Sequence, residues 1–264
     1  MKINIDEGYL AYEIRGTGVP ILFIHGYPLS RQIWRPQLDG LQDRARMIAL
    51  DLRGHGDSFP FEGPYTMDLL AEDCHMLLKE LNTSSPIVVC GLSMGGYITM
   101  ALYRKYPQLF KAMILTSTRP GADSLEGKAN RQASVKNVEQ HGAGYIADDM
   151  LQKAVSPITL SSKPGLVADI NIIMSKTSVQ GIVGALKGMM ERPDSTVTLA
   201  KATCPVLIIH GVDDQLIPIK EAEATHRLIP GSQLVKIPAA GHLPCLEQPE
   251  IFNRAIRDFL TSIV

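Results

Sequence analysis

The sequence predicts an α/β protein in which helices cover both faces of a mostly parallel sheet. Five short apolar runs recur at wide intervals, and none of them alternates apolar with polar residues: 21–24, 47–50, 87–90, 113–115 and 206–209. A strand that is apolar on both sides needs a sheet with two dry faces, which is typical of parallel strands between helices. Helix-like segments separate the runs, so strand and helix alternate in βαβ units.

Two segments have the apolar spacing of helices that lie against such a sheet. Thr66 is suited to cap a helix over 66–81, and Pro249 suits the first turn of a C-terminal helix. The apolar stripes of these helices are Leu70, Cys74, Leu77 and Leu81 in the first, and Phe252, Ile256, Phe259 and Ile263 in the second. We expect each helix to bury this one face.

The beginning of the chain departs from the βαβ pattern. Segments 3–6 and 9–15 both resemble strands, but they are too close for a helix to join them. The pair Glu7-Gly8 between them resembles a hairpin turn. The sheet is therefore expected to open with an antiparallel edge.

Residues 119–200 also depart from the pattern, because they contain no comparable apolar run and show only weak helical periodicity. We expect a helical cap there, inserted into an α/β core that consists of 1–118 and 201–264. The segment contains four methionines, Met150, Met174, Met189 and Met190. Such side chains over a cleft would suit an apolar ligand, but methionine more often fills gaps in a core, which we favour.

Composition limits the class of protein. In 264 residues, 26 Lys and Arg balance 27 Asp and Glu, so no long-range field attracts nucleic acid or an anionic membrane. A hydrophobic content of 45% with 20% charged residues is typical of a folded globular chain. We therefore expect no nucleic-acid partner and no membrane partner, while the oligomeric state stays open.

The sequence also indicates a cytoplasmic protein. Residues 1–15 lack the apolar core of a secretory signal, and no run of 18 apolar residues could span a membrane. The four cysteines have no C-x-x-C spacing and are expected to be reduced thiols. Without export, the sequon Asn82-Thr83-Ser84 is expected to carry no sugar.

The strongest chemical signal is a G-x-S-x-G motif. Gly91-Leu92-Ser93-Met94-Gly95 directly follows the strand run 87–90 and precedes a helix-like stretch. Small residues are needed there because the turn from strand to helix is so sharp that a side chain at either glycine would clash. The turn presents the Ser93 hydroxyl at a helix N-terminus, where N–H groups can stabilise negative charge. Ser93 is therefore the predicted nucleophile.

A serine nucleophile needs a base, and the base needs an acid to orient it. After the run 206–209, Asp213 and Asp214 both stand at the end of a strand, where the active sites of open α/β sheets assemble. His242 follows the next expected strand, 233–238. The order of serine, acid and histidine is the one expected of α/β-hydrolases. At this point, both aspartates stay candidates.

Several motifs together resemble the α/β-hydrolase superfamily, in its carboxylesterase, enol-lactonase and cofactor-free perhydrolase branch. The motifs extend over nearly the whole chain: His25-Gly26-Tyr27-Pro28, Asp51–Ser58, Gly91–Gly96, Gly211–Pro218 and Gly241-His242. The resemblance implies a mostly parallel eight-stranded sheet with a helical cap between the sixth and seventh strands. It also selects Asp214 over Asp213 as the acid, through the pattern G-x-x-D-x-x-x-P. Some relatives carry the acid after the sixth strand, where this chain has only Thr116-Ser117-Thr118.

The resemblance also implies roles for two loops. The backbone N–H of Tyr27, in the H-G-x-P pattern, joins that of Met94 as an oxyanion-hole donor. We expect the side chains of Tyr27 and Met94 to line the acyl pocket. His25 is expected to hold its loop rather than act as a base, and Asp51–Ser58 is expected to be a supporting loop.

Neither a metal nor a cofactor is expected. The chain has no H-x-H or H-E-x-x-H spacing for a metal and no phosphate-binding P-loop. Residues 142–147 match G-x-G-x-x-A, but no strand precedes them as a dinucleotide site requires.

The predicted function is a serine hydrolase of small carboxylic esters or lactones, with Ser93, Asp214 and His242 as the catalytic residues. Two alternatives stay open. The same residues could perform perhydrolysis or hydrolysis of carbon–carbon bonds, or the chain could be a receptor that binds a small ligand beneath its cap without catalysis. Neither the natural substrate nor its acyl length follows from the sequence.

Overall fold

The computed structural model describes residues 1–83 and 86–263, which form eight strands in one sheet of order β1-β2-β4-β3-β5-β6-β7-β8. β2 pairs antiparallel with β1 and β4, and the neighbours from β4 to β8 are parallel. The predicted fold class, a mostly parallel eight-stranded sheet between helices, is confirmed. The strands are β1 Lys2–Ile5, β2 Gly8–Arg15, β3 Val19–Ile24, β4 Ala45–Leu50, β5 Ile87–Leu92, β6 Phe110–Thr116, β7 Val206–Gly211 and β8 Gln233–Ile237.

Ser84, the last residue of the sequon, lies outside the described residues.

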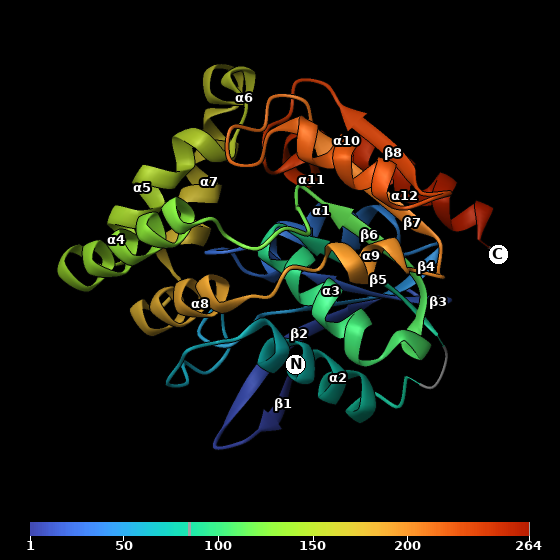
Figure 1. Ribbon diagram of the computed structural model, residues 1–264, viewed down its shortest axis with the longest axis horizontal. Coiled ribbons are helices and arrows are strands. Elements are labelled where there is room, and N and C mark those ends of the chain that lie inside the picture. The colour runs from blue at the N-terminus through green and yellow to red at the C-terminus, as the bar shows by residue number, and fades with distance from the viewer. Residues whose placement is uncertain (84–85, 264) are drawn as a thin grey trace.

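Helices pack on both faces of this sheet, and Figure 1 shows α2 and α3 in front of the strands. Two short 3-10 helices span Arg31–Trp34 and Pro107–Leu109. The α-helices are α1 Arg35–Gly40, α2 Met67–Glu80, α3 Met94–Lys105, α4 Leu125–His141, α5 Ala143–Ala154, α6 Pro157–Ser162, α7 Pro164–Ser175, α8 Val179–Glu191, α9 Thr196–Ala200, α10 Ile219–Leu228, α11 Pro244–Glu247 and α12 Pro249–Ser262.

Alternate residues of the central strands supply two separate cores, which explains the unbroken apolar runs. In β3, Leu22 and Ile24 belong to the core that contains α2 and α3. Ile21 and Phe23 belong to the core that contains α1 and α12. All four side chains have 0% exposure. Since both faces of the sheet are dry, an apolar side chain is needed at every position of the strand.

The two predicted helices, now α2 and α12, bury the predicted stripes. The Thr66 hydroxyl caps α2 by accepting a hydrogen bond from the N–H of Leu69 at 3.1 Å. Pro249 stands in the first turn of α12, and Ile263 follows its last turn and is half-buried. The buried stripe residues are Leu70, Cys74 and Leu77 in α2, and Phe252, Ile256 and Phe259 in α12.

The predicted antiparallel edge is present, but the predicted turn is wrong by one residue. Ile5 pairs with Gly8, so the turn is formed by Asp6 and Glu7, and Asp6 has the positive φ of 44°. Gly8 serves packing instead, because a Cβ there would lie 2.7 Å from the ring of Phe59. A short polar side chain tolerates the left-handed backbone that the turn requires.

Between β6 and β7, residues 119–200 form α4 to α9 and contain no strand. Helices α4 to α8 gather on one side of the molecule, whereas α9 packs against α3 and α10. Met174 and Met189 are buried in the two cores, as we favoured for these methionines, and Met189 also lines a cavity together with Met150. The boundaries of a separate cap domain stay a prediction.

This helical segment is attached to the loops at the carboxyl ends of the strands. The Thr177 hydroxyl donates a hydrogen bond to the carbonyl of Pro28 at 2.7 Å. The approach of Gly181 to Gly54 is so close that a Cβ on Gly181 would lie 2.1 Å from the Gly54 carbonyl oxygen. Helices α4 to α8 therefore lie over the sheet edge where the predicted catalytic residues stand.

None of the described helices is long and apolar enough to cross a lipid bilayer.

Candidate active site

Ser93 stands at a strained turn between β5 and α3. Its backbone has φ 55° and ψ −112°, which few residues other than glycine adopt. A Cβ on Gly91 would lie 2.2 Å from the Gly95 carbonyl oxygen, and one on Gly95 would lie 2.2 Å from the Ile24 carbonyl oxygen. These contacts explain why both positions of the motif are glycine. Ser93 itself is half-buried at the carboxyl end of β5.

The end of β6 holds this turn in place, a role that we did not predict for its residues. The N–H of Ser93 donates to the carbonyl of Thr116 at 2.9 Å, and the Thr118 hydroxyl donates to the carbonyl of Ser93 at 2.9 Å. A Cβ on Gly96 would lie 2.5 Å from the Thr118 hydroxyl. Thr116 at the end of β6 and Thr118 just after it, neither of which carries a carboxylate, thus fix the backbone of the predicted nucleophile.

Asp214 and His242 come together although 28 positions separate them in the chain. The Nδ1 atom of His242 lies 2.8 Å from Oδ2 of Asp214. The other oxygen of Asp214 accepts hydrogen bonds from the N–H groups of Leu216 and Ile217, both at 2.9 Å. Asp213 is half-buried and uses its N–H to donate to the carbonyl of Ala240 at 2.9 Å. Of the two candidate acids, Asp214 therefore contacts the histidine.

The surroundings of Asp214 keep it ionised. Burial would raise the pKa of this carboxyl, but the neighbouring His242 imidazole and hydrogen bonds from His210, His242 and Ile217 outweigh burial and hold the pKa well below its usual value. His210 is an additional neighbour that we did not predict. Its Nε2 lies 2.8 Å from the carbonyl of Ile217 and 3.3 Å from Oδ2 of Asp214.

His25 holds its loop, as predicted. Nδ1 donates to the carbonyl of Gly26 at 2.8 Å, and Nε2 accepts from the N–H of Leu52 at 3.0 Å. Both ring nitrogens are therefore in use, and burial lowers the pKa of His25 to about 4. A neutral imidazole with two backbone partners has no lone pair left to take a proton from Ser93.

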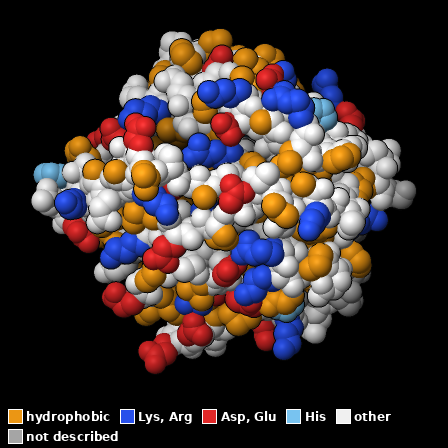
Figure 2. Space-filling model, in the orientation of Figure 1, with side chains coloured by type: hydrophobic (Ala, Val, Ile, Leu, Met, Phe, Trp, Pro, Cys, Tyr) orange, Lys and Arg blue, Asp and Glu red, His pale blue; other side chains and the backbone are white. Residues whose placement is uncertain are grey.

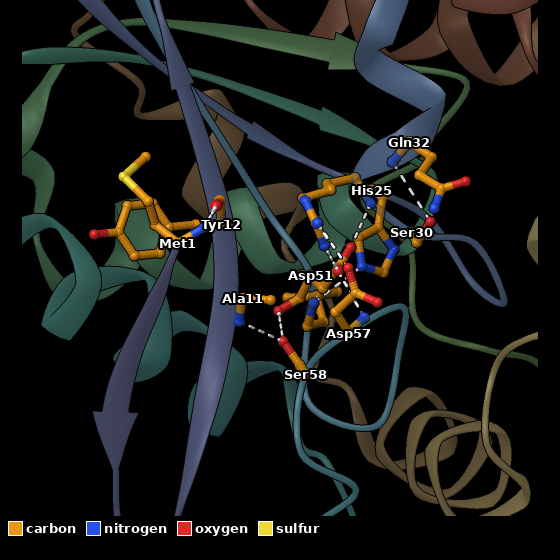
Figure 3. A network of polar contacts seen from close by, with 11 residues as sticks. Met1, Ala11, Tyr12, His25, Ser30, Gln32, Asp51, Asp57 and Ser58 are labelled. Carbon is orange, nitrogen blue, oxygen red and sulfur yellow. Dashed lines mark hydrogen bonds and ion pairs between the residues drawn. The ribbon is translucent and has the colours of Figure 1, made fainter.

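The loop Asp51–Ser58 is a support, also as predicted. Figure 3 shows Asp51 between His25 and Asp57, where polar contacts join the loops after β3 and β4. Asp51 accepts hydrogen bonds from the N–H groups of Arg31 at 2.6 Å and Asp57 at 2.8 Å, and it forms an ion pair with the Arg31 guanidinium. The Ser58 hydroxyl donates to the carbonyl of Asp51 at 2.7 Å.

The two proposed oxyanion donors come from the loop after β3 and from the first residue of α3. Among the hydrogen bonds of the described residues, the N–H groups of Tyr27 and Met94 have no protein acceptor. The side chain of Tyr27 lines a cavity, as expected. The expectation for Met94 is wrong, because its fully buried side chain packs in the core with α2.

A cavity of about 210 Å³ contains the predicted nucleophile and base. Ser93 and His242 both line it, with no direct hydrogen bond between them; such bonds often form only when substrate binds. The lining residues are Tyr27, Ser93, Tyr97, Arg119, Arg131, Met150, Met189, Leu216, Ile217 and His242. The cavity therefore combines an apolar wall with two cationic side chains.

Glu247 of α11 holds the loop that carries His242, and sequence patterns did not indicate this role. Its carboxylate is completely buried. Oε1 accepts from the N–H groups of Gly241 at 2.8 Å and Leu243 at 3.3 Å. Oε2 accepts from the N–H of Ser156 at 2.7 Å and the hydroxyl of Thr159 at 2.8 Å. One carboxylate thus joins the histidine loop to the helical segment between β6 and β7.

Within residues 1–83 and 86–263, no group of three or more His, Cys, Asp or Glu side chains has the arrangement of a metal site.

Comparison with known proteins agrees with this fold. Residues 19–152 and 154–249 match the family described as alpha/beta hydrolase fold. A thermophilic esterase from Thermogutta terrifontis, in its malate-bound structure, is 41% identical with a TM-score of 0.95, over 97% of this chain and 94% of that one. 3-Oxoadipate enol-lactonase 2 of Acinetobacter baylyi is 28% identical over 89% of this chain and 86% of its own length. A 2-(acetamidomethylene)succinate hydrolase of Mesorhizobium japonicum is 27% identical over 98% of this chain and 95% of its own length.

Proposed function

The chain belongs to the α/β-hydrolase family, and from this premise we propose that it is a serine hydrolase that cleaves carboxylic esters of small molecules, including lactones. One observation carries the proposal. The hydrogen-bonded pair of Asp214 and His242 lies at a cavity that also contains Ser93, at a strained turn. The similarity to an esterase and an enol-lactonase supports this reaction class.

The first half of the proposed reaction forms an acyl-enzyme. Ser93 Oγ attacks the ester carbonyl carbon while Nε2 of His242 accepts the hydroxyl proton. Asp214 keeps the His242 proton on Nδ1 and stabilises the charge of the imidazolium. The N–H groups of Tyr27 and Met94 stabilise the negative oxygen of the tetrahedral intermediate. When the carbon–oxygen bond breaks, His242 returns its proton to the leaving alcohol.

The second half releases the acid. Water attacks the acyl carbon as His242 takes one of its protons, and a second tetrahedral intermediate forms. This intermediate expels Ser93 Oγ, which recovers its proton from His242. With a lactone, the alcohol and the acid belong to one molecule, so ring opening and hydrolysis give a single hydroxy acid.

The proposal includes a cytoplasmic location, which the four free cysteines support.

The test uses p-nitrophenyl acetate and butyrate with wild type, Ser93→Ala and the matched control Ser161→Ala. Ser161 is an exposed serine of α6. We expect Ser93→Ala to lose at least about a thousandfold in kcat while it folds normally, and Ser161→Ala to match wild type. A fluorophosphonate should label wild type at Ser93. Wild-type rates in Ser93→Ala would falsify the proposal.

A further inference from the structure

The cavity beside Ser93 contains more positive charge than its protein neighbours balance. Arg119 and Arg131 line it, and no Asp or Glu is among its described lining residues. The nearest paired carboxylate is that of Asp123, which is also shared by Arg192. Three guanidinium groups therefore surround one carboxylate, and this cluster has an excess of two positive charges. Asp149, a further carboxylate near Tyr27, is paired with Lys153.

Asp123 uses only part of the hydrogen-bonding capacity of these arginines. Arg131 contacts it through Nε at 2.6 Å, and the described residues offer no partner to the two terminal nitrogens of Arg131. Arg119 reaches it only at 3.5 Å, and its own Nε is buried without a partner. Arg192 also has Nε and Nη1 buried without a partner, but its guanidinium carbon lies 4.0 Å from the ring of Tyr97. Unused donors therefore remain on all three arginines, and those of Arg119 and Arg131 lie at the cavity.

A further polar group at the cavity has no partner. The hydroxyl of Tyr27 is buried and makes no hydrogen bond to a described residue. Only 9% of the Tyr27 residue is exposed, so bulk water does not readily compensate for the missing bond. A buried hydroxyl donor beside two guanidinium groups is the environment that a carboxylate prefers, because each oxygen can accept several charge-assisted hydrogen bonds.

Figure 2, in the orientation of Figure 1, shows Lys or Arg side chains in a recess between helices α4 to α7 and the core. The side chains of Arg119 and Arg131 are 33% and 22% exposed, so neither is free in solvent nor fully buried. A charge that is partly withdrawn from water without compensation is costly, and a ligand anion would offset this cost.

We propose that this cavity takes esters or lactones that carry a free carboxylate, with the reacting carbonyl at Ser93 and the carboxylate bound by Arg131 and Arg119. The inference rests on the proposed function and names the substrate class for the same site. Met150, Met189, Leu216 and Ile217 would contact the short apolar part between the two ends of the substrate.

The first experiment compares pairs of esters in which one member ends in a carboxylate and the other in a methyl group, with the same number of carbon atoms. For a carboxylate on the acyl side, the pair is mono-p-nitrophenyl adipate and p-nitrophenyl hexanoate. For a carboxylate on the alcohol side, the pair is 3-carboxypropyl hexanoate and butyl hexanoate. Their hydrolysis is measured as acid release in a pH-stat. We expect wild type to have the higher kcat/KM for the charged member of at least one pair, and we expect added NaCl to reduce this preference because the arginines are partly exposed. The pair that shows the preference identifies the side of the ester that carries the carboxylate.

The second experiment removes the charge at each arginine. Arg131→Gln and Arg119→Gln should each lower the ratio of charged to neutral kcat/KM by about tenfold, and Arg131→Lys should retain part of it. Arg257→Gln is the matched control, because Arg257 is a similarly exposed arginine that pairs with Asp43 outside the cavity. The ratio does not depend on how much enzyme is folded, so partial unfolding cannot imitate the effect.

The outcomes separate this inference from the function on which it rests. If wild type hydrolyses the neutral esters through Ser93 but shows no charge preference, or if both Gln variants keep the wild-type ratio, the carboxylate site is wrong and the hydrolase stands. If wild type hydrolyses none of the four esters and no fluorophosphonate labels Ser93, both proposals are overturned.

Discussion

The Nδ1 atom of His242 lies 2.8 Å from Oδ2 of Asp214, and these side chains are only 2% and 0% exposed. Burial makes the contact strong, because little water competes for either partner. The second Asp214 oxygen is held by two backbone N–H groups, so the carboxylate has one orientation. The pair thus presents a fixed imidazole to the cavity that contains Ser93.

Asp214→Asn should lower kcat by about 10³ to 10⁴ without unfolding the protein. The amide oxygen can still accept the N–H groups of Leu216 and Ile217, which leaves the amide N–H₂ facing Nδ1 of His242. The imidazole would then carry its proton on Nε2 and could not accept one from Ser93. Circular dichroism and p-nitrophenyl butyrate turnover measure the two effects. Asp213→Asn is the control, and equal losses in both variants would contradict the assignment of the acid.

Glu247→Gln should destabilise the protein and impair catalysis together. All four groups that the carboxylate binds are donors, so one amide N–H₂ of glutamine would face N–H or O–H groups. We expect a loss of about 1 to 3 kcal/mol in the free energy of unfolding and a lower kcat from a displaced His242 loop. Urea denaturation and steady-state kinetics measure these. Glu250→Gln, at an exposed glutamate in α12, should change neither.

Gly95→Ala should prevent correct folding around the nucleophile. The new Cβ would lie 2.2 Å from the Ile24 carbonyl oxygen, and the contact is with backbone that cannot rotate away. Gly144→Ala is the matched control in α5, where a Cβ meets nothing within 4 Å. Alanine there should stabilise the protein by up to about 0.5 kcal/mol, because Gly144 stands in the first turn of α5, where the gain is smaller than inside a helix. Thermal unfolding of both variants checks this, and a Gly95→Ala protein with wild-type Tm and activity would refute the packing argument.

The free energy of unfolding should fall as pH falls from 6.5 towards 4. Burial lowers the pKa of His25 to about 4 and that of His55 to about 3, from an ordinary value of 6.5. Below pH 6.5 the unfolded chain therefore binds more protons than the folded protein, so this part of the stability is complete above pH 6.5 and is lost on acidification. In this pH range, each histidine should lower the free energy of unfolding by on the order of 1 kcal/mol per pH unit of acidification.

Urea denaturation at several pH values between 7 and 4.5 measures this slope. His25→Asn should be less stable at pH 7 but show a shallower decline, because one of the buried imidazoles is gone. His141→Asn, at an exposed histidine that ends α4, should leave the slope nearly unchanged. A slope in His25→Asn as steep as in wild type would exclude the buried imidazole as its source.

The features that the sequence predicted correctly are those that neighbouring residues determine. The apolar runs of the central strands indicated a sheet with two dry faces, and the glycines around Ser93 indicated a turn too sharp for side chains. The hairpin shows the limit of such patterns. Gly8 resembled a turn residue, but its close contact with Phe59, far away in the sequence, explains why it is glycine.

The sequence by itself determined the α/β class, the strained serine and the order of serine, acid and histidine, since strand periodicity and turn geometry depend on a few adjacent residues. Only the tertiary structure decided, independently of family resemblance, that Asp214 rather than Asp213 contacts His242. It also decided that Glu247 joins the histidine loop to Ser156 and that Arg119 and Arg131 share a cavity with Ser93. The reason is physical: hydrogen bonds and ion pairs act over a few ångströms, and packing of the whole chain brings these side chains within that range.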